Sequence, residues 1–312
     1  MKRLAVACAL LLAAAAACAQ PEDHEPAWTR GTLPGVGMAD LPVLHRAERT
    51  PPLRYRVVVL PGSGCAGLAP IAQRYFAGLL HAEVLVLHKP GTDLDAGPAP
   101  AQCTSEFVAG DDLARWHEHA RHALRMAALD TAARVPTVLV GISEGGELLP
   151  ALAPELPGLA GLVLLSSPGL DPREAGELQA RRGGVLADWQ ALGKIQASAL
   201  PDTALVQGRS LGYWRSFWRW PLAQPLIDAP WPLLQVWGEA DALVPAEAYQ
   251  RFAMRAQGRA APFCTRSFAG ADHGLQGVAP GIGRINGVQR VWAWLEQWAR
   301  APQDGWCAML PP

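Results

Sequence analysis

The stretch TVLVGISEGG, residues 137–146, decides the fold. Its first four residues are apolar or β-branched and predict a buried strand. Glycines at 141 and 145 flank Ser143, and a helical pattern follows over residues 147–152. A serine on so sharp a turn between strand and helix needs small neighbours, because the turn crowds and strains the backbone. An ordinary glycine-rich loop between a strand and a helix is the alternative.

Further strand-like runs lie on both sides of this stretch, at residues 55–60, 83–88, 162–165, 233–237 and 266–268. Strands as apolar as most of these are usually covered on both faces, as in parallel sheets. Helical patterns alternate with them at residues 69–81, 111–128 and 284–298. We therefore expect an α/β fold in which a mostly parallel sheet is flanked by helices, formed by residues 51–170 and 227–312.

The alternation of strands and helices breaks between residues 171 and 226. This stretch shows no strand pattern but holds a dense aromatic patch between Tyr213 and Trp220. We interpret it as a helical cap inserted between two strands of the sheet. Trp214 and Trp218 share one helical face at i, i+4 spacing, and we expect them to contact the substrate. The alternative is that the patch forms the core of the cap.

Two more motifs follow later strands, GEAD at residues 238–241 and DHG at residues 272–274. A serine hydroxyl needs a base and an orienting acid to become a nucleophile. With a GxSxG motif and the chain order Ser143, Asp241, His273, residues 55–300 resemble the α/β-hydrolase superfamily. The resemblance implies that Ser143 is the nucleophile, His273 the base and Asp241 the acid. The two antiparallel strands that usually open this fold are not recognisable before Tyr55.

Other residues around the expected triad have competing interpretations. Asp171 follows the strand at 162–165 and is the alternative acid, whereas Asp272 is expected to cap its own loop. Glu144 should give its backbone N–H to an oxyanion hole, while its side chain is expected to lie in solvent. The second donor should be the backbone N–H of Ser63, with Gly64 as the alternative.

Metal and cofactor chemistry finds no support in the sequence. His117, His119 and His122 lie close together, but their spacing is not that of the HExxH zinc motif, and we expect a solvated helix face. No CxxC pair is present. The formal net charge of −1 and the scattered arginines give no basic stripe, so nucleic acid is not an expected partner.

The first residues are expected to direct export. Lys2 and Arg3 precede an apolar, alanine-rich run, which is typical of a signal peptide over residues 1–19. Two interpretations stay open: cleavage before Gln20 for a periplasmic or secreted protein, or lipidation of Cys18 as a membrane anchor. Residues 20–50 are rich in proline, glycine and charge and are expected to form a loosely structured lead-in.

Four cysteines remain after residue 19, an even number that suits two disulfides in an oxidising compartment. We predict the pairs Cys65–Cys103 and Cys264–Cys307. The first two follow neighbouring strands, and the last lies in a tail that needs anchoring. Buried free thiols are the alternative.

Together these observations predict an exported serine hydrolase that cleaves carboxylic esters, acts on a small acyl substrate and needs no cofactor or metal. A peptidase, a thioesterase, an acyltransferase and a non-catalytic exported binding protein on the same fold are the alternatives. The sequence does not give the oligomeric state.

Overall fold

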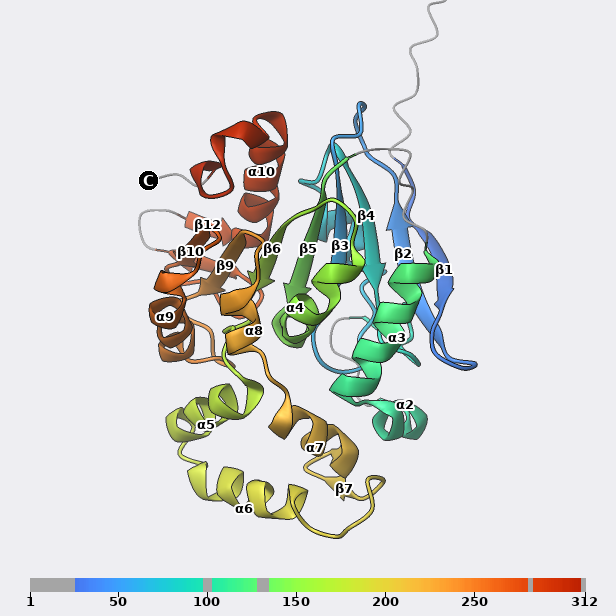
Figure 1. Ribbon diagram of the computed structural model, residues 1–312, viewed down its shortest axis with the longest axis vertical. Helices are drawn as coiled ribbons and strands as arrows, with labels where there is room; N and C mark the ends of the chain where they lie inside the picture. The colour runs from blue at the N-terminus through green and yellow to red at the C-terminus, as the bar shows by residue number, and fades with distance from the viewer. Residues whose placement is uncertain (1–25, 98–102, 128–134, 280–282, 310–312) are drawn as a thin grey trace, which may run out of the picture.

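The computed structural model describes residues 26–97, 103–127, 135–279 and 283–309 (Figure 1). Its main feature is an eight-stranded sheet in the order β1-β2-β4-β3-β5-β6-β9-β10. The strands are β1 (Thr29–Pro34), β2 (Asp40–Arg46), β3 (Tyr55–Leu60), β4 (Ala82–Leu87), β5 (Thr137–Ile142), β6 (Leu159–Leu165), β9 (Leu233–Gly238) and β10 (Phe263–Phe268). The strands from β4 to β10 run parallel. This confirms the predicted mostly parallel α/β sheet.

Helices cover both faces of the sheet. The α-helices are α1 (Ala72–Tyr75), α2 (Ser105–Gly110), α3 (Leu113–Met126), α4 (Leu149–Leu152), α5 (Pro172–Arg182), α6 (Leu186–Gln196), α7 (Leu211–Arg219), α8 (Ala223–Asp228), α9 (Ala246–Arg255) and α10 (Gly287–Arg300). None of the helices in the described ranges is long and apolar enough to cross a bilayer. The expected signal segment and Cys18 lie outside the described residues.

Alternation along the strands divides the core into two layers. On β3, Val57 and Val59 pack with residues of α1 and α10, among them the fully buried Trp292. Val58 and Leu60 point to the opposite face and pack with α3, α4, α8 and α9. Because both faces are buried, these strands carry almost no polar side chains. Because β3, β5, β6 and β9 run parallel, their carboxyl ends lie at one edge of the sheet.

The expectation of a loosely structured lead-in at residues 20–50 is wrong for residues 29–34 and 40–46, which form the two opening strands. β1 pairs antiparallel with β2, and β2 pairs antiparallel with β4. Leu41 and Leu44 of β2 are fully buried. The pattern is hard to see in the sequence, since β1 is an exposed edge strand and Pro42 interrupts the apolar residues of β2.

Between β6 and β9 the chain forms α5, α6, a short hairpin, α7 and α8 (Figure 1). α5, α6 and α7 lie beyond the carboxyl ends of the parallel strands, and α8 returns to pack on the sheet. The hairpin joins β7 (Leu205–Val206) and β8 (Arg209–Ser210). The sequence analysis expects no strand here, because two residues per strand are too few to give a pattern.

Two disulfides join distant parts of the chain. Cys65, after β3, is bonded to Cys103, before α2. Cys264 on β10 is bonded to Cys307 near the C-terminal end of the described chain. These are the pairs that the sequence predicts. They are compatible with an extracellular location.

Candidate active site

Ser143 lies at the carboxyl end of β5, where the chain turns into a 3₁₀ helix at Ser143–Leu148. Its φ of 52° is in the left-handed region, and this conformation is unfavourable for any residue other than glycine. Neither flanking glycine could carry a side chain, because the neighbouring backbone is too close. A Cβ on Gly141 would lie 2.4 Å from the Cα of Gly146, and one on Gly145 would lie 2.1 Å from the Leu60 carbonyl oxygen. The turn therefore needs the glycines of the GxSxG motif.

His273 and Asp241 complete a hydrogen-bonded chain with Ser143. The Nε2 of His273 lies 3.0 Å from the Ser143 Oγ, and its Nδ1 lies 2.7 Å from an Asp241 carboxylate oxygen. Asp241 follows β9 and His273 follows β10, so the three side chains meet at the carboxyl ends of parallel strands of one sheet. This geometry allows the imidazole to take a proton from the serine hydroxyl while the carboxylate orients the ring.

Asp241 is buried and fully hydrogen-bonded. Its Oδ1 accepts the backbone N–H groups of Leu243 and Val244, and its Oδ2 accepts the hydroxyl of Tyr249 at 3.0 Å. Burial alone would raise the pKa of Asp241, but the hydrogen bonds from His273 and the two backbone groups outweigh it and hold this pKa below its usual value. The acid is therefore ionised at neutral pH.

The other two aspartates have different partners. Asp171 accepts hydrogen bonds from the backbone N–H groups of Leu222 and Ala223, which ties the end of the cap to the residues after β6. Asp272 accepts the backbone N–H of Gln276, as expected of a loop cap. In the described structure neither carboxylate is bonded to His273.

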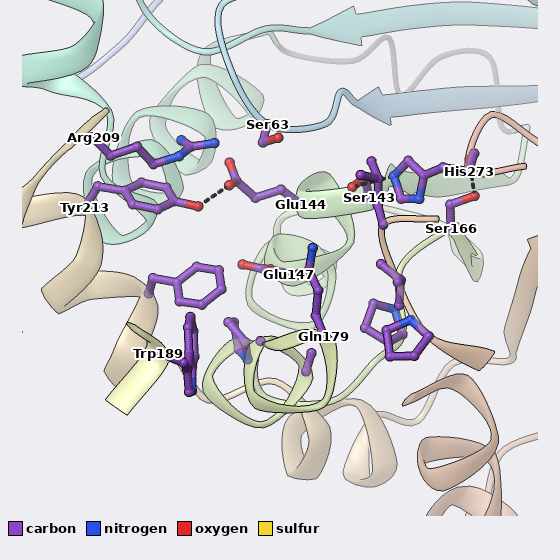
Figure 2. Close-up of a pocket in the computed structure, with 18 of the residues that line it drawn as sticks. Ser63, Ser143, Glu144, Glu147, Ser166, Gln179, Trp189, Arg209, Tyr213 and His273 are labelled. Atoms are coloured by element: carbon purple, nitrogen blue, oxygen red, sulfur yellow. Dashed lines mark hydrogen bonds between the residues drawn. The ribbon is translucent and has the colours of Figure 1, made fainter. Parts of the chain in front are cut away.

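Ser166 also belongs to this site, although the sequence analysis does not single it out. Its hydroxyl donates to the backbone carbonyl of His273 at 2.6 Å (Figure 2). Its φ of 53° is again left-handed. Because Ser166 follows β6, this bond fixes the loop that carries the histidine, after β10, to the end of β6. Its position directly after an apolar strand is the only signal the sequence holds.

The expected oxyanion donors lie beside the serine. Glu144 is the next residue in the chain, and Ser63 lies on the loop after β3. That loop packs close to Ser143, because a Cβ on Gly62 would lie 3.3 Å from the Ser143 Cβ. Figure 2 shows Ser63 and Glu144 on the same side of the serine. Their position is suitable for two backbone donors, which is the role proposed for them below.

The side chain of Glu144 is buried, so the expectation of a solvated carboxylate is wrong. It accepts a short hydrogen bond from the Lys89 ammonium and a second, at 2.6 Å, from the hydroxyl of Tyr213 in α7 (Figure 2). Burial would raise the pKa of Glu144, but Lys89 and Arg209 lower it more. The residue after the nucleophile is thereby fixed both to the core and to the cap.

Asp111 and Arg209 extend this buried network. Asp111 accepts from Lys89 at 2.6 Å and from Arg209 at 2.7 Å. Burial would lower the pKa of Lys89, yet Glu144 and Asp111 raise it above its usual value. Arg209 also lies over the Tyr213 ring, 4.1 Å from its centroid. Two cations and two anions thus balance one another between the core and the cap.

A cavity of about 340 Å³ lies beside Ser143 and His273 (Figure 2). Its cap side is aromatic, formed by Trp189, Tyr213, Trp214 and Phe217. Of the two predicted substrate contacts, Trp214 lines this cavity. Trp218 does not; its ring packs at a tilt against Trp189, with the ring centroids 4.6 Å apart. Trp218 therefore lies against α6, which also brings it close to Gly193.

Glu147 also lines the cavity, although the sequence analysis treats it only as part of the following helix. Its Oε2 is buried and has no hydrogen-bond partner in the described structure. Burial, and next the charge of Glu144, raise the pKa of Glu147 well above its usual value. These two effects favour the uncharged form of the Glu147 carboxyl group.

The three histidines of α3 are only partly exposed, so the expectation of a solvated helix face is wrong. His119 accepts the backbone N–H of Val36, and the His117 ring lies 5.8 Å from the ring of Trp220. Burial lowers the pKa of both. Within the described ranges, no group of three or more His, Cys, Asp or Glu side chains could hold a metal ion.

The strand order and the position of the serine turn define the α/β-hydrolase fold. No family model and no curated protein matches the sequence. Solved structures do match. An esterase domain of a Rhodothermus marinus protein aligns at 18% identity and a TM-score of 0.55, covering 88% of this chain and 98% of its own.

Two other solved structures have the same fold. A thermophilic esterase, Est2 of the Planctomycetes species Thermogutta terrifontis, aligns at 16% identity and a TM-score of 0.56, covering 92% of this chain and 95% of its own. A puromycin-hydrolyzing peptidase of Mycobacterium tuberculosis aligns at 15% identity and a TM-score of 0.55, covering 88% of this chain and 39% of its own. These similarities are to hydrolases and show the fold.

Proposed function

We propose that this protein is a serine hydrolase that cleaves carboxylic esters through an acyl-enzyme. One observation carries the proposal: Ser143, His273 and Asp241 form an unbroken hydrogen-bonded chain at the wall of a cavity. Several solved structures of this fold are esterases, which favours an ester substrate.

In the proposed mechanism, His273 takes the proton of Ser143 as its Oγ attacks the acyl carbonyl carbon. Asp241, held ionised by its hydrogen bonds, orients the ring and stabilises the imidazolium. Backbone N–H groups of Glu144 and Ser63 donate hydrogen bonds to the oxyanion. His273 then protonates the leaving alcohol, and water, deprotonated by the same histidine, releases the acid and restores the serine.

The buried network supports the oxyanion hole in this proposal. Because Glu144 is bonded through its side chain to Lys89 and Tyr213, its backbone N–H is held in one direction. Donors placed in advance do not have to reorganise during the reaction, which is why they stabilise the transition state.

Peptide or thioester hydrolysis and acyl transfer would use the same residues. Because one of the similar structures is a peptidase, peptide hydrolysis is an alternative to ester hydrolysis. A non-catalytic binding protein is the alternative of another class, but its site would not need a complete triad. We further propose an exported protein whose partner is a small acyl compound. Neither nucleic acid nor, apart from an anchor at Cys18, a membrane is a proposed partner.

The test is a panel of p-nitrophenyl esters with acyl chains of increasing length, hydrolysed by the wild-type protein and by Ser143→Ala. We expect turnover by the wild type and only the buffer rate with the variant. Matching melting temperatures would show that the variant is folded. Equal rates for the two proteins would contradict the proposal, and faster cleavage of matched thioesters or anilides would move it to another acyl class.

A further inference from the structure

Glu147 lines the proposed substrate cavity, and its carboxyl group has no hydrogen-bond partner in the described structure. It lies one turn after Ser143 in the 3₁₀ helix Ser143–Leu148, and Figure 2 shows it between Ser143 and Trp189. Its backbone carbonyl accepts the Trp220 indole N–H, which fixes the backbone here. The side chain has no such partner in the described structure, and its Oε2 is buried.

The neighbouring charges do not pair with Glu147. Lys89 is bonded to Glu144 and Asp111, and Arg209 to Asp111. The two cations are thus already matched by two carboxylates. Burial and, next, the charge of nearby Glu144 raise the pKa of Glu147 well above its usual value, which favours the uncharged form of its carboxyl group.

A buried polar group without a partner costs free energy, and a ligand that pairs it recovers that cost. The walls around Glu147 are aromatic, from Trp189, Tyr213 and Phe217, and suit a flat apolar group. From these contacts we propose that Glu147 is a specificity residue for esters whose aromatic part carries an uncharged hydroxyl group. A hydroxyl both donates and accepts a hydrogen bond, so it can pair with this carboxyl group in either protonation state.

Gln179 of α5 lines the same cavity and offers a second uncharged polar group. An unsubstituted ring would displace water from Glu147 and leave the acid unpaired, which is how sites built for a hydroxyl reject analogues that lack it. A charged carboxylate is a poor alternative, because both nearby cations are already paired. In the described structure no hydrogen bond joins Glu147 to Ser143 or His273, so a role in proton transfer is not proposed.

This inference rests on the proposed hydrolase function, and its test compares four substrates in each protein. They are methyl 3-phenylpropanoate and its three ring-hydroxylated forms, with the hydroxyl at position 2, 3 or 4. For the wild type we expect kcat/KM about tenfold or more higher for the best hydroxylated ester. In Glu147→Leu this ratio should fall to about one, and in Glu147→Gln, which keeps a donor and an acceptor, most of it should remain.

Two controls separate the outcomes. Glu118→Leu removes an exposed carboxylate of α3 and should keep the wild-type ratio. Labelling by a fluorophosphonate reports whether each variant still has an active, folded site. No preference in a labelled wild type, or a preference that survives in Glu147→Leu, would overturn the inference alone. If the wild-type protein is not labelled by the fluorophosphonate and cleaves none of the esters, both the proposed function and this inference are overturned.

Discussion

At the scale of single residues, three side chains from three strand ends are held by partners that do not take part in the reaction. Ser143 depends on two glycines that leave room for its turn, and Asp241 on two backbone N–H groups and Tyr249. The loop of His273 is fixed by Ser166. The three groups of the proposed triad are therefore positioned before any substrate arrives, as the proposed mechanism requires.

The first prediction concerns the acid. Asp241→Asn keeps the shape of the side chain but removes the charge that orients His273 and stabilises its protonated form. We expect kcat for ester hydrolysis to fall by about a thousandfold or more, with little change in melting temperature. The matched control is Asp171→Asn, whose oxygen can still accept the two backbone N–H groups of the cap. Its activity should stay within about twofold of the wild type. A large loss in Asp171→Asn with an active Asp241→Asn would reverse the two assignments.

The three triad residues can be predicted from the sequence because each one lies in a short motif next to a strand. The buried network around Glu144 cannot. Its partners Lys89 and Tyr213 are 55 and 69 positions away in the sequence, and each is unremarkable in its own segment. Burial of a charged residue depends on such distant partners, so a local pattern describes Glu144 and Asp111 as ordinary surface residues.

At the scale of elements, the reliability of a prediction follows from how a strand or helix is buried. Central strands such as β3 and β5 are buried on both faces and are visible as apolar runs. The opening strands β1 and β2 lie at the edge of the sheet, where exposure and Pro42 remove that signal. In the cap, the position of an aromatic residue on α7 decides whether it faces the cavity or another helix, and i, i+4 spacing alone does not separate the two.

That difference on α7 leads to a second prediction. Trp214→Ala should change the preference for acyl-chain length, because each methylene that loses its contact with the wall weakens binding by about 0.8 kcal/mol. Trp218→Ala should lower the melting temperature, since the ring packs against Trp189, and should leave the preference unchanged. The measurements are melting curves and the p-nitrophenyl ester panel for both variants. An altered preference in Trp218→Ala alone would show that the structure assigns the two rings wrongly.

At the scale of the whole molecule, contacts between cap and core run through charged and polar groups close to the nucleophile. Arg209 and Tyr213 of the cap reach Asp111 and Glu144 of the core, and Asp171 binds the backbone where the cap returns to the sheet. The roof of the cavity is thus fixed to the residue next to Ser143. The disulfides act elsewhere, at the loop after β3 and at the last strand.

A third prediction follows from the Cys65–Cys103 bond. It closes a loop with a sequence separation of 38, and such a bond contributes about 4 kcal/mol by restricting the unfolded chain. The double variant Cys65→Ala/Cys103→Ala should therefore unfold at a clearly lower denaturant concentration than the wild type. Mapping of non-reduced peptides should recover both pairs in the wild-type protein. Free thiols, or a crossed pair such as Cys65–Cys264, would contradict the structure.

The most direct test of the central claim is the site at which a fluorophosphonate reacts. Only a serine that a neighbouring base activates attacks the phosphorus of the probe and displaces its fluoride, and the test needs no knowledge of the substrate. Peptide mapping of the labelled wild-type protein should find one adduct, on Ser143, and Ser143→Ala and His273→Ala should stay unlabelled while folded. An unlabelled wild type, or an adduct on another residue, would contradict the assignment of Ser143, His273 and Asp241 as a catalytic triad.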